Sequence, residues 1–206
     1  MGLFGRIGKG EPYDWLVVGL GNPGEKYART RHNVGEEAVR LLAERRGVTL
    51  KGGRDNALVA ETRLPGPDGD QRVVLAFPIT YMNESGQAVS ALVRRYRIET
   101  PEQIIVVQDE LDLPPGELKI KAGGGLAGHN GLRSITQHLK TQDYLRVRIG
   151  VGKPDHKDVG KGHVLSKVPK HERELLDIEI ANAADAVELI IARGVDAAMQ
   201  RYNGKP

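Results

Sequence analysis

The stretch WLVVGLGNPG, residues 15–24, indicates the class of fold. Its first six residues are apolar and rich in Val and Leu, and the Gly, Asn and Pro residues behind them are typical of a turn. This pattern predicts a buried strand that runs directly into a turn. A second apolar run, IIVVQ at residues 104–108, predicts another buried strand that leads into Asp109. Strands without polar alternation are typical of sheets covered on both faces.

Helical patterns alternate with these strands. Apolar residues at helical spacing predict a helix from Val34 to about Gly47, with Asn33 as its N-cap, and a second helix that starts near Ser85. Further helices are expected at residues 132–139 and over a long segment that ends at Gly194. Additional strands are expected at residues 57–63, 71–76, 118–122 and 145–150, the first two as a hairpin.

The order of these elements predicts an α/β fold, with a single domain built on a mixed, twisted β-sheet flanked by helices on both faces. We assign this domain to residues 15–206 and expect the Gly-rich, polar residues 1–14 to form a flexible N-terminal arm. Ligands of such sheets bind beyond the carboxyl ends of the strands. A site is therefore expected in the loops that begin at Gly21, Pro78, Asp109 and Gly123.

The composition agrees with one globular domain. Of 206 residues, 39% are hydrophobic and 28% are charged, which supplies a core and argues against a disordered chain. There is no cysteine, which excludes disulfides, thiolate nucleophiles, zinc ribbons and iron–sulfur clusters. No apolar run approaches the ~18 residues of a membrane span, and no secretory signal is present. We therefore expect a cytoplasmic protein without a membrane partner.

The net charge of +3 hides an asymmetry along the chain. Residues 119–170 hold eleven Lys and Arg residues and three Asp residues, a charge of +8, so the remainder carries −5. Such segregation is typical of a surface that faces a polyanion, although a solvated basic face would have the same composition.

Two glycine-rich stretches resemble nucleotide-binding motifs. Residues 19–24 match G-x-G-x-x-G, but that motif needs a helix that opens within it, and here Pro23 intervenes and the helical pattern begins only near Asn33. A nicotinamide-dependent oxidoreductase is therefore disfavoured. Residues 123–131 lack the Gly-Lys-Ser/Thr ending of a phosphate loop, which leaves a mobile loop and a backbone-lined substrate site as alternatives.

The six histidines show no spacing typical of a metal site. There is no H-E-x-x-H motif, and His32 and His129 would need carboxylates brought in from elsewhere. There is also no G-x-S-x-G motif for a nucleophilic serine. We expect neither a metal nor another cofactor.

A set of polar residues at the ends of predicted elements forms the candidate site. Each has an ordinary explanation, because Asn caps helices and Asp is common in turns. Together they suit hydrolysis, since His accepts a proton from water near neutral pH, a carboxylate orients it, and Asn amides bind an ester or amide. The set comprises Asn22, His32, Asn83, Asp109 and Asn130.

Four blocks of the sequence resemble the bacterial peptidyl-tRNA hydrolase family. The resemblance implies a monomeric, metal-independent esterase that cleaves the bond between a peptide and the 3′ ribose of tRNA. Its substrate would be peptidyl-tRNA from stalled or aborted translation, and its product would be recycled tRNA. The blocks are VVGLGNPGEKYARTRHNVG (17–35), ITYMNESGQAV (79–89), VVQDELDLPPGELKIKAGGGLAGHNGLRSI (106–135) and RVRIGVGKP (146–154).

The resemblance also implies residue roles. His32 would be the general base and Asp109 the carboxylate that orients and polarises it. Asn22 would recognise N-blocked substrates, and Asn83 and Asn130 would hold substrate and water. The residues implied for the channel of the peptide and terminal nucleotide are Tyr27, Tyr81 and Met82, and those implied for a clamp on the tRNA 5′ phosphate are Lys119, Lys121 and Arg148.

Some positions depart from the family pattern, and one alternative function remains. Gln108 stands where many relatives have His, and Leu126 and Ala127 replace a more polar pair in the glycine-rich loop. The main alternative is a non-catalytic RNA-binding protein on the same fold, similar to relatives in plant organelles that act in RNA splicing. The basic stretch fits both functions, whereas the intact set of five polar residues favours the enzyme.

Overall fold

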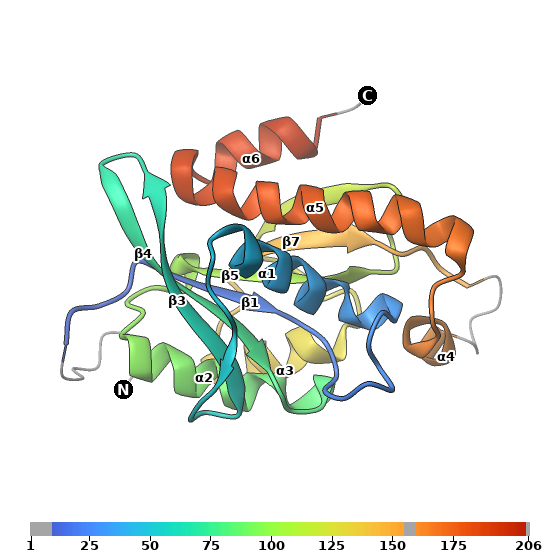
Figure 1. Cartoon of the computed structure of the whole chain (residues 1–206), viewed down its shortest axis with the longest axis horizontal. Coiled ribbons are helices and arrows are strands. Elements are labelled where there is room, and N and C mark those ends of the chain that lie inside the picture. Colours follow the sequence, from blue (N-terminus) through green and yellow to red (C-terminus); the bar gives the residue numbers. More distant parts are fainter. Residues whose placement is uncertain (1–9, 155–159, 205–206) are drawn as a thin grey trace.

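Seven strands form one mixed sheet in the spatial order β2-β3-β4-β1-β5-β7-β6 (Figure 1). The computed structural model describes residues 10–154 and 160–204. Strands β4, β1, β5 and β7 run parallel, whereas β2, β3 and β6 pair antiparallel with their neighbours. The strands are β1 (Trp15–Gly19), β2 (Lys51–Gly52), β3 (Ala57–Gly66), β4 (Gly69–Pro78), β5 (Ile104–Glu110), β6 (Leu118–Ala122) and β7 (Leu145–Gly150).

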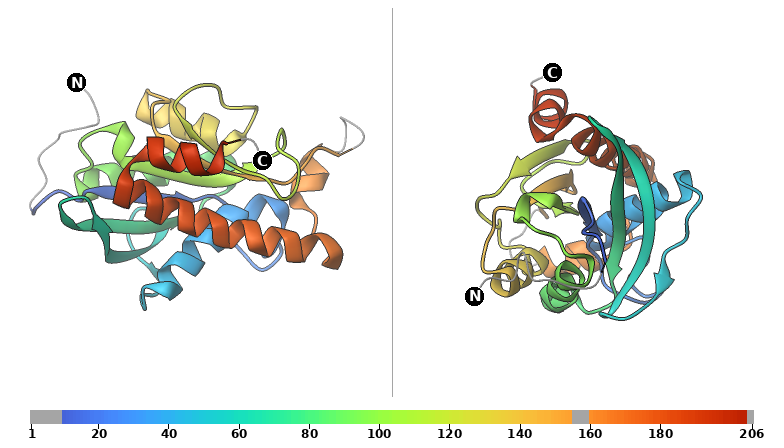
Figure 2. Two further views of the ribbon diagram at one scale, coloured as in Figure 1. Left: turned by 90° about the horizontal axis from the view of Figure 1, so that it is seen from above. Right: turned by 90° about the vertical axis from the view of Figure 1, so that its left-hand side faces the viewer.

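Helices cover both faces of this sheet. Helices α1, α5 and α6 pack on one face and α2 and α3 on the other. The right-hand view of Figure 2 separates the two groups, with α5 and α6 at the top and α2 and α3 at the bottom. The helices are α1 (Val34–Arg45), α2 (Ser85–Tyr96), α3 (Asn130–Leu139), α4 (Gly160–Leu165), α5 (Lys170–Arg193) and α6 (Val195–Tyr202), with the single 3-10 turns η1 (Arg31–Asn33), η2 (Met82–Glu84) and η3 (Pro101–Gln103).

The apolar runs that predicted a doubly covered sheet divide between two cores. Val17 of β1 and Val107 of β5 pack under α1 and α5, whereas Val18 and Val106 pack under α2 and α3. All four side chains are fully buried. The predicted α/β class, with a mixed sheet and helices on both faces, is confirmed.

Two glycines of the first motif region serve close packing. A Cβ at Gly19 would lie 2.3 Å from the carbonyl oxygen of Gly35, and a Cβ at Gly35 would lie 2.1 Å from that of Val107. The start of α1 therefore lies directly against β1 and β5. Because α1 begins only at Val34, no helix opens within the G-x-G-x-x-G stretch of residues 19–24, which agrees with the sequence argument against dinucleotide binding.

Several boundaries differ from the predicted ones. Strand β5 continues to Glu110, because Asp109 and Glu110 still pair with Ile149 and Gly150 of β7. Asp109 thus lies inside a strand and not at the start of a loop. The hairpin of β3 and β4 is also longer, since pairing continues to its tip, and β2, α4 and α6 were not predicted.

Asn33 occupies the predicted N-cap position of α1, but its side chain has another role. The side chain of Asn33 makes no cap hydrogen bond and is used by the chain near Asn22 instead. Residues 1–9 of the arm lie outside the described residues. Within the described part of the expected arm, the backbone amides of Tyr13 and Asp14 donate to the carbonyls of Tyr96 and Arg72.

No helix within residues 10–154 and 160–204 combines the length and apolar character needed to cross a bilayer.

Candidate active site

One cavity lies where the parallel strands end. Asn22 follows β1, Met82 follows β4 and Asp109 is near the end of β5, and these strands are neighbours in the sheet. The cavity has a volume of about 730 Å³. Its lining includes eight of the residues predicted from the sequence, namely Asn22, Tyr27, His32, Tyr81, Met82, Asn83, Asp109 and Asn130.

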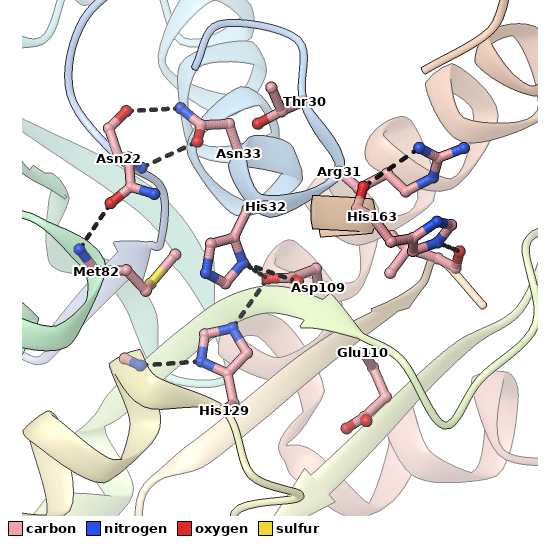
Figure 3. Close-up of polar contacts among 12 residues, drawn as sticks. Asn22, Thr30, Arg31, His32, Asn33, Met82, Asp109, Glu110, His129 and His163 are labelled. Carbon is pink, nitrogen blue, oxygen red and sulfur yellow. Dashed lines mark hydrogen bonds and ion pairs between the residues drawn. The ribbon is translucent and has the colours of Figure 1, made fainter. Parts of the chain in front are cut away.

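His32 and Asp109 form the polar centre of the cavity (Figure 3). Nδ1 of His32 lies 2.9 Å from both carboxylate oxygens of Asp109. The Asp109 side chain is 2% exposed and that of His32 is 12% exposed. An ionised carboxylate only accepts hydrogen bonds, so Nδ1 of His32 carries the proton and the lone pair of the neutral ring is on Nε2. Nε2 has no hydrogen-bond partner among residues 10–154 and 160–204, and it is the atom free to accept a proton from water.

His129 is a second partner of Asp109 that sequence reasoning did not select. Its Nε2 lies 2.9 Å from Oδ1 of Asp109. Its Nδ1 accepts the backbone N–H groups of Gly131 at 3.1 Å and Leu132 at 3.4 Å, which makes His129 the N-cap of α3. Since Nδ1 accepts, the proton of the neutral ring is on Nε2, which donates to Asp109. Asp109 therefore receives one hydrogen bond from each imidazole.

Burial and the neighbouring groups shift the pKa of His32 in opposite directions, and the same holds for the pKa of Asp109. Burial lowers the pKa of His32, but the charge and hydrogen bond of Asp109 raise that pKa more, and the net shift is upward. Burial raises the pKa of Asp109, but the two imidazoles that donate to it hold the pKa well below its ordinary value. Asp109 is therefore ionised at neutral pH and stabilises a protonated His32.

The same three residues satisfy the distances of a metal site but not its donor chemistry. Ligand atoms of His32, Asp109 and His129 lie within 4.8 Å of one another, so the structure supplies the carboxylate that the sequence argument lacked. A coordinating nitrogen needs a free lone pair. Nδ1 of His32 and Nε2 of His129 both carry the protons that they donate to Asp109, so their lone pairs are not available. The hydrogen bonds favour an imidazole–carboxylate–imidazole group over metal ligands.

Asn22 lines the cavity and joins neighbouring segments of the chain through hydrogen bonds to Asn33 and Met82. Its backbone N–H donates to Oδ1 of Asn33 and its carbonyl accepts from Nδ2 of Asn33, both at 2.9 Å. Its side-chain oxygen accepts the backbone N–H of Met82 at 2.8 Å. The amide oxygen of Asn22 is thus already used, and the NH₂ group is the part that can donate to a ligand.

Apolar residues form another part of the cavity wall, and Arg31 anchors the helix that carries two of them. Val164 and Leu165 of α4 line the cavity with Leu111. Arg31, directly before His32, donates to the His163 carbonyl of α4 at 3.4 Å and forms an ion pair of 2.6 Å with Glu172 of α5. Arg31 is 5% exposed, so it fixes α4 beside the proposed base through buried contacts.

The three residues expected to clamp a phosphate lie outside this cavity, on β6 and β7. Lys119 pairs directly across from Arg148, and Nε of Arg148 lies 3.0 Å from the buried Glu110. Burial first, and then the guanidinium groups of Arg146 and Arg148, lower the pKa of Lys121. A bound anion would stabilise these neighbouring positive charges.

Arg146 of the basic stretch is not part of the surface. It is 1% exposed and donates to the carbonyl oxygens of Gly123, Gly124 and Gly125. Of the basic residues in the stretch 119–170, Arg146 therefore adds no charge to the surface. Arg146 instead holds the first part of the glycine-rich loop, because three carbonyls converge on one guanidinium.

The positions that depart from the family pattern lie near the cavity but differ in effect. Ala127 lines the cavity, and Leu126 packs against the core beneath α2 and α3. Gln108 is 1% exposed, pairs across from Arg148 and has no hydrogen-bond partner for its amide among the described residues. Only Ala127 changes the wall of the cavity directly.

Sequence reasoning missed His129 and Arg133, both of which line the cavity. His129 was considered only as a metal ligand, and its place before Asn130 in the H-N-G motif was the available signal. Arg133 was counted only as one charge of the basic stretch.

The sequence and the fold match known proteins over nearly the whole chain. The family model of peptidyl-tRNA hydrolases matches residues 16–206. The chain is 46% identical over 189 residues to the peptidyl-tRNA hydrolase of Chloroflexus aggregans, covering 92% of this chain and 98% of that protein. It is 50% identical over 189 residues to that of Frankia casuarinae, covering 92% and 93%.

Solved structures agree with these relatives. The crystal structure of peptidyl-tRNA hydrolase from Acinetobacter baumannii superposes with a TM-score of 0.83 at 41% identity, covering 95% of this chain and 98% of that chain. A crystal structure of peptidyl-tRNA hydrolase in complex with N-propanol superposes with a TM-score of 0.85 at 41% identity and the same coverage.

Proposed function

The chain belongs to the peptidyl-tRNA hydrolase family and hydrolyses the ester bond of peptidyl-tRNA, and we propose that His32 activates the attacking water. The observation that carries the proposal is the orientation of His32. Its Nδ1 is bound by the buried Asp109, and its Nε2 is left as the proton acceptor in a cavity of about 730 Å³.

The reaction needs one proton relay and one anion site. Water attacks the carbonyl carbon of the peptidyl ester as its proton passes to Nε2 of His32, and the bond between that carbon and the ribose oxygen then breaks. The proton on His32 passes to the ribose oxygen, which leaves as a hydroxyl. Asp109 stabilises the imidazolium between these two transfers. A positioned general base contributes ~10²–10⁴-fold to such a reaction.

The amides of Asn83 and Asn130 are the proposed ligands of the water and of the developing oxyanion. Both side chains line the cavity and carry no charge. A neutral NH₂ group donates to the oxyanion without adding a charge that would alter the pKa of His32. Removal of one such donor typically costs ~10²–10³-fold in rate.

Substrate recognition divides between the cavity and the adjacent basic surface. We assign the blocked N-terminus of the substrate to the NH₂ group of Asn22, and the channel for the peptide and terminal nucleotide to Tyr27, Tyr81 and Met82. Lys119, Lys121 and Arg148 are assigned to the tRNA 5′ phosphate. We also propose that the protein acts as a monomer in the cytoplasm, on peptidyl-tRNA from stalled or aborted translation.

A non-catalytic RNA-binding protein is the alternative that remains from sequence reasoning. The relatives and the solved structures described above are named as peptidyl-tRNA hydrolases, which does not favour this alternative. RNA binding alone would also not require an imidazole with one nitrogen fixed by a buried carboxylate and the other in a cavity.

The assay that tests the function compares two substrates. Purified protein should release the N-acetylamino acid from N-acetylated aminoacyl-tRNA and should leave unblocked aminoacyl-tRNA largely intact. Asn22→Asp serves as the matched variant, because it keeps the shape of the side chain but replaces the NH₂ donor with an oxygen. Absence of any release from the blocked substrate would contradict the activity, and equal release from both substrates would contradict the role of Asn22.

A further inference from the structure

One wall of the cavity is a polar stripe along α3. Asn130, Arg133, Ser134 and Gln137 all line the cavity and are spaced three, four and seven residues apart. This spacing places them on one face of the helix. Ser134 is buried and its Oγ accepts the backbone N–H of Gly86 at 2.9 Å, so it joins α3 to α2. Arg133 and Gln137 are exposed and remain available to a ligand.

The apolar residues of the cavity come from other elements. Leu111 follows β5, and Val164 and Leu165 belong to α4. Figure 3 shows His129, at the start of α3, below His32, and His163, in α4, to the right of His32. The polar residues of α3 and the apolar residues of α4 therefore form different parts of the cavity wall near the proposed base. A substrate with an acyl part and a nucleotide part suits such a division, because each wall matches one part.

Arg133 carries the charge of the polar wall. It is the one Lys or Arg among the lining residues that belong to the described part of the chain. Its guanidinium makes no ion pair and no hydrogen bond with any other residue in the described ranges 10–154 and 160–204. Lys119 and Arg148, in contrast, already lie near the carboxylates of Glu117 and Glu110. An unpaired guanidinium beside a substrate site is suited to a phosphate group, which it binds through two parallel hydrogen bonds.

We propose that Arg133 binds the phosphodiester that precedes the terminal nucleotide of the tRNA, with Gln137 one turn further along the single-stranded 3′ end. This proposal rests on the proposed function, which places the scissile ester on the terminal ribose beside His32. The nearest phosphate of the substrate is then one nucleotide from the reacting bond, and Arg133 is the cation that the described lining of the cavity offers it. In this proposal Arg133 binds a phosphate of the acceptor end. The 5′ phosphate is bound by Lys119, Lys121 and Arg148.

Three substrates of decreasing length separate these two phosphate sites. N-acetylaminoacyl-tRNA has both phosphates, the N-acetylaminoacyl ester of the trinucleotide CCA keeps the phosphodiesters but lacks the 5′ phosphate of tRNA, and N-acetylaminoacyl-adenosine has no phosphate. Arg133→Gln removes the charge and Arg133→Lys keeps it without the planar fork. Lys140→Gln is the matched control, because Lys140 is an exposed cation at the end of α3 that does not line the cavity.

We expect Arg133→Gln to raise KM about 10-fold for the tRNA and trinucleotide esters, as for one lost charged hydrogen-bond contact, and to leave KM of the adenosine ester within twofold. Arg133→Lys should recover part of this loss, and Lys140→Gln should match wild type on the trinucleotide ester. An unchanged KM for the trinucleotide, or an equal rise for the adenosine ester, would overturn the proposal. If wild-type protein cleaves none of the three esters, the proposed function itself fails.

Discussion

Nδ1 of His32 lies 2.9 Å from both carboxylate oxygens of Asp109, although the two residues are 77 positions apart in the sequence. His32 belongs to the turn before α1, and Asp109 belongs to β5, whose residues are all buried. Asp109 still pairs with Ile149 of β7, and a side chain on a paired strand is held more precisely than one on a loop. The position of Asp109 inside β5 therefore orients the imidazole with little freedom to turn.

The activity should depend on a single group that is active when deprotonated. Because Asp109 raises the pKa of His32, we expect kcat/KM of the wild-type protein to rise with pH along an acid limb whose midpoint lies above about 6.5, the ordinary value for His. Initial rates of N-acetylaminoacyl-tRNA hydrolysis between about pH 5 and pH 8 measure this limb. A rate that falls over this range would contradict a neutral His32 as the active form.

Asp109→Asn should move the acid limb of the kcat/KM profile to lower pH. The substitution removes the charge that raises the pKa of His32 but keeps the burial that lowers it, so the midpoint should fall below that of wild type. The plateau rate should also drop by roughly 10²–10⁴-fold, since an amide does not fix the tautomer or stabilise the imidazolium. An unchanged midpoint in this variant would show that Asp109 does not act on the base.

Two substitutions of His129 separate its two contacts. An Asn at this N-cap can still accept the backbone N–H groups of α3 but is too short to reach Asp109, whereas Ala loses both contacts. We expect His129→Asn to keep the thermal stability and lose roughly 10-fold in kcat, as one hydrogen bond to a charged group is weakened. His129→Ala should lose activity similarly and also ~0.5–2 kcal/mol of folding free energy. Wild-type kcat in both variants would limit His129 to a structural role.

Lys121→Ala should weaken the binding of full-length tRNA only. We expect KM to rise for N-acetylaminoacyl-tRNA but not for the trinucleotide ester, which lacks the 5′ phosphate. The slope of log affinity against log salt should decrease by about 0.7–0.9 for the lost contact. Lys153→Ala is the control, because Lys153 is 67% exposed and pairs with Asp112. A slope that stays the same in Lys121→Ala would contradict the clamp.

Removal of metal ions should not affect the enzyme. Nδ1 of His32 and Nε2 of His129 both donate protons to Asp109 and have no lone pair for a cation. Treatment with EDTA followed by desalting should therefore leave kcat unchanged. A loss of activity that added Zn²⁺ or Mn²⁺ restores would show that the three residues act as metal ligands.

Local patterns in the sequence predict most of the architecture but not its exact boundaries. The apolar runs at residues 15–20 and 104–108 indicate strands because burial on both faces leaves no polar alternation. Asp109 reads as a turn residue because nothing local shows that β7 continues to pair beside it. Helix α6 is not predicted, because Gly194 is typical of the end of a helix. In the structure the chain turns at Gly194 and forms another helix.

For the site as well, local motifs predict most of the residues but not the contacts between them. Motif positions place His32, Asp109 and the three Asn residues in one set, but their meeting depends on strand order, which no local pattern contains. His129 was missed because its two contacts come from α3 and from β5. Arg146 looks like a surface cation until the loop carbonyls that surround it are known.

The central claim, that His32 is the general base, is tested most directly by single-turnover hydrolysis with His32→Asn. The substitution keeps a polar side chain but removes the nitrogen that accepts the proton. With saturating enzyme, the account predicts that the hydrolysis rate of N-acetylaminoacyl-tRNA falls by ~10²–10⁴-fold while the Kd for tRNA stays within about twofold of wild type. A rate within a few-fold of wild type, with unchanged Kd, would contradict it.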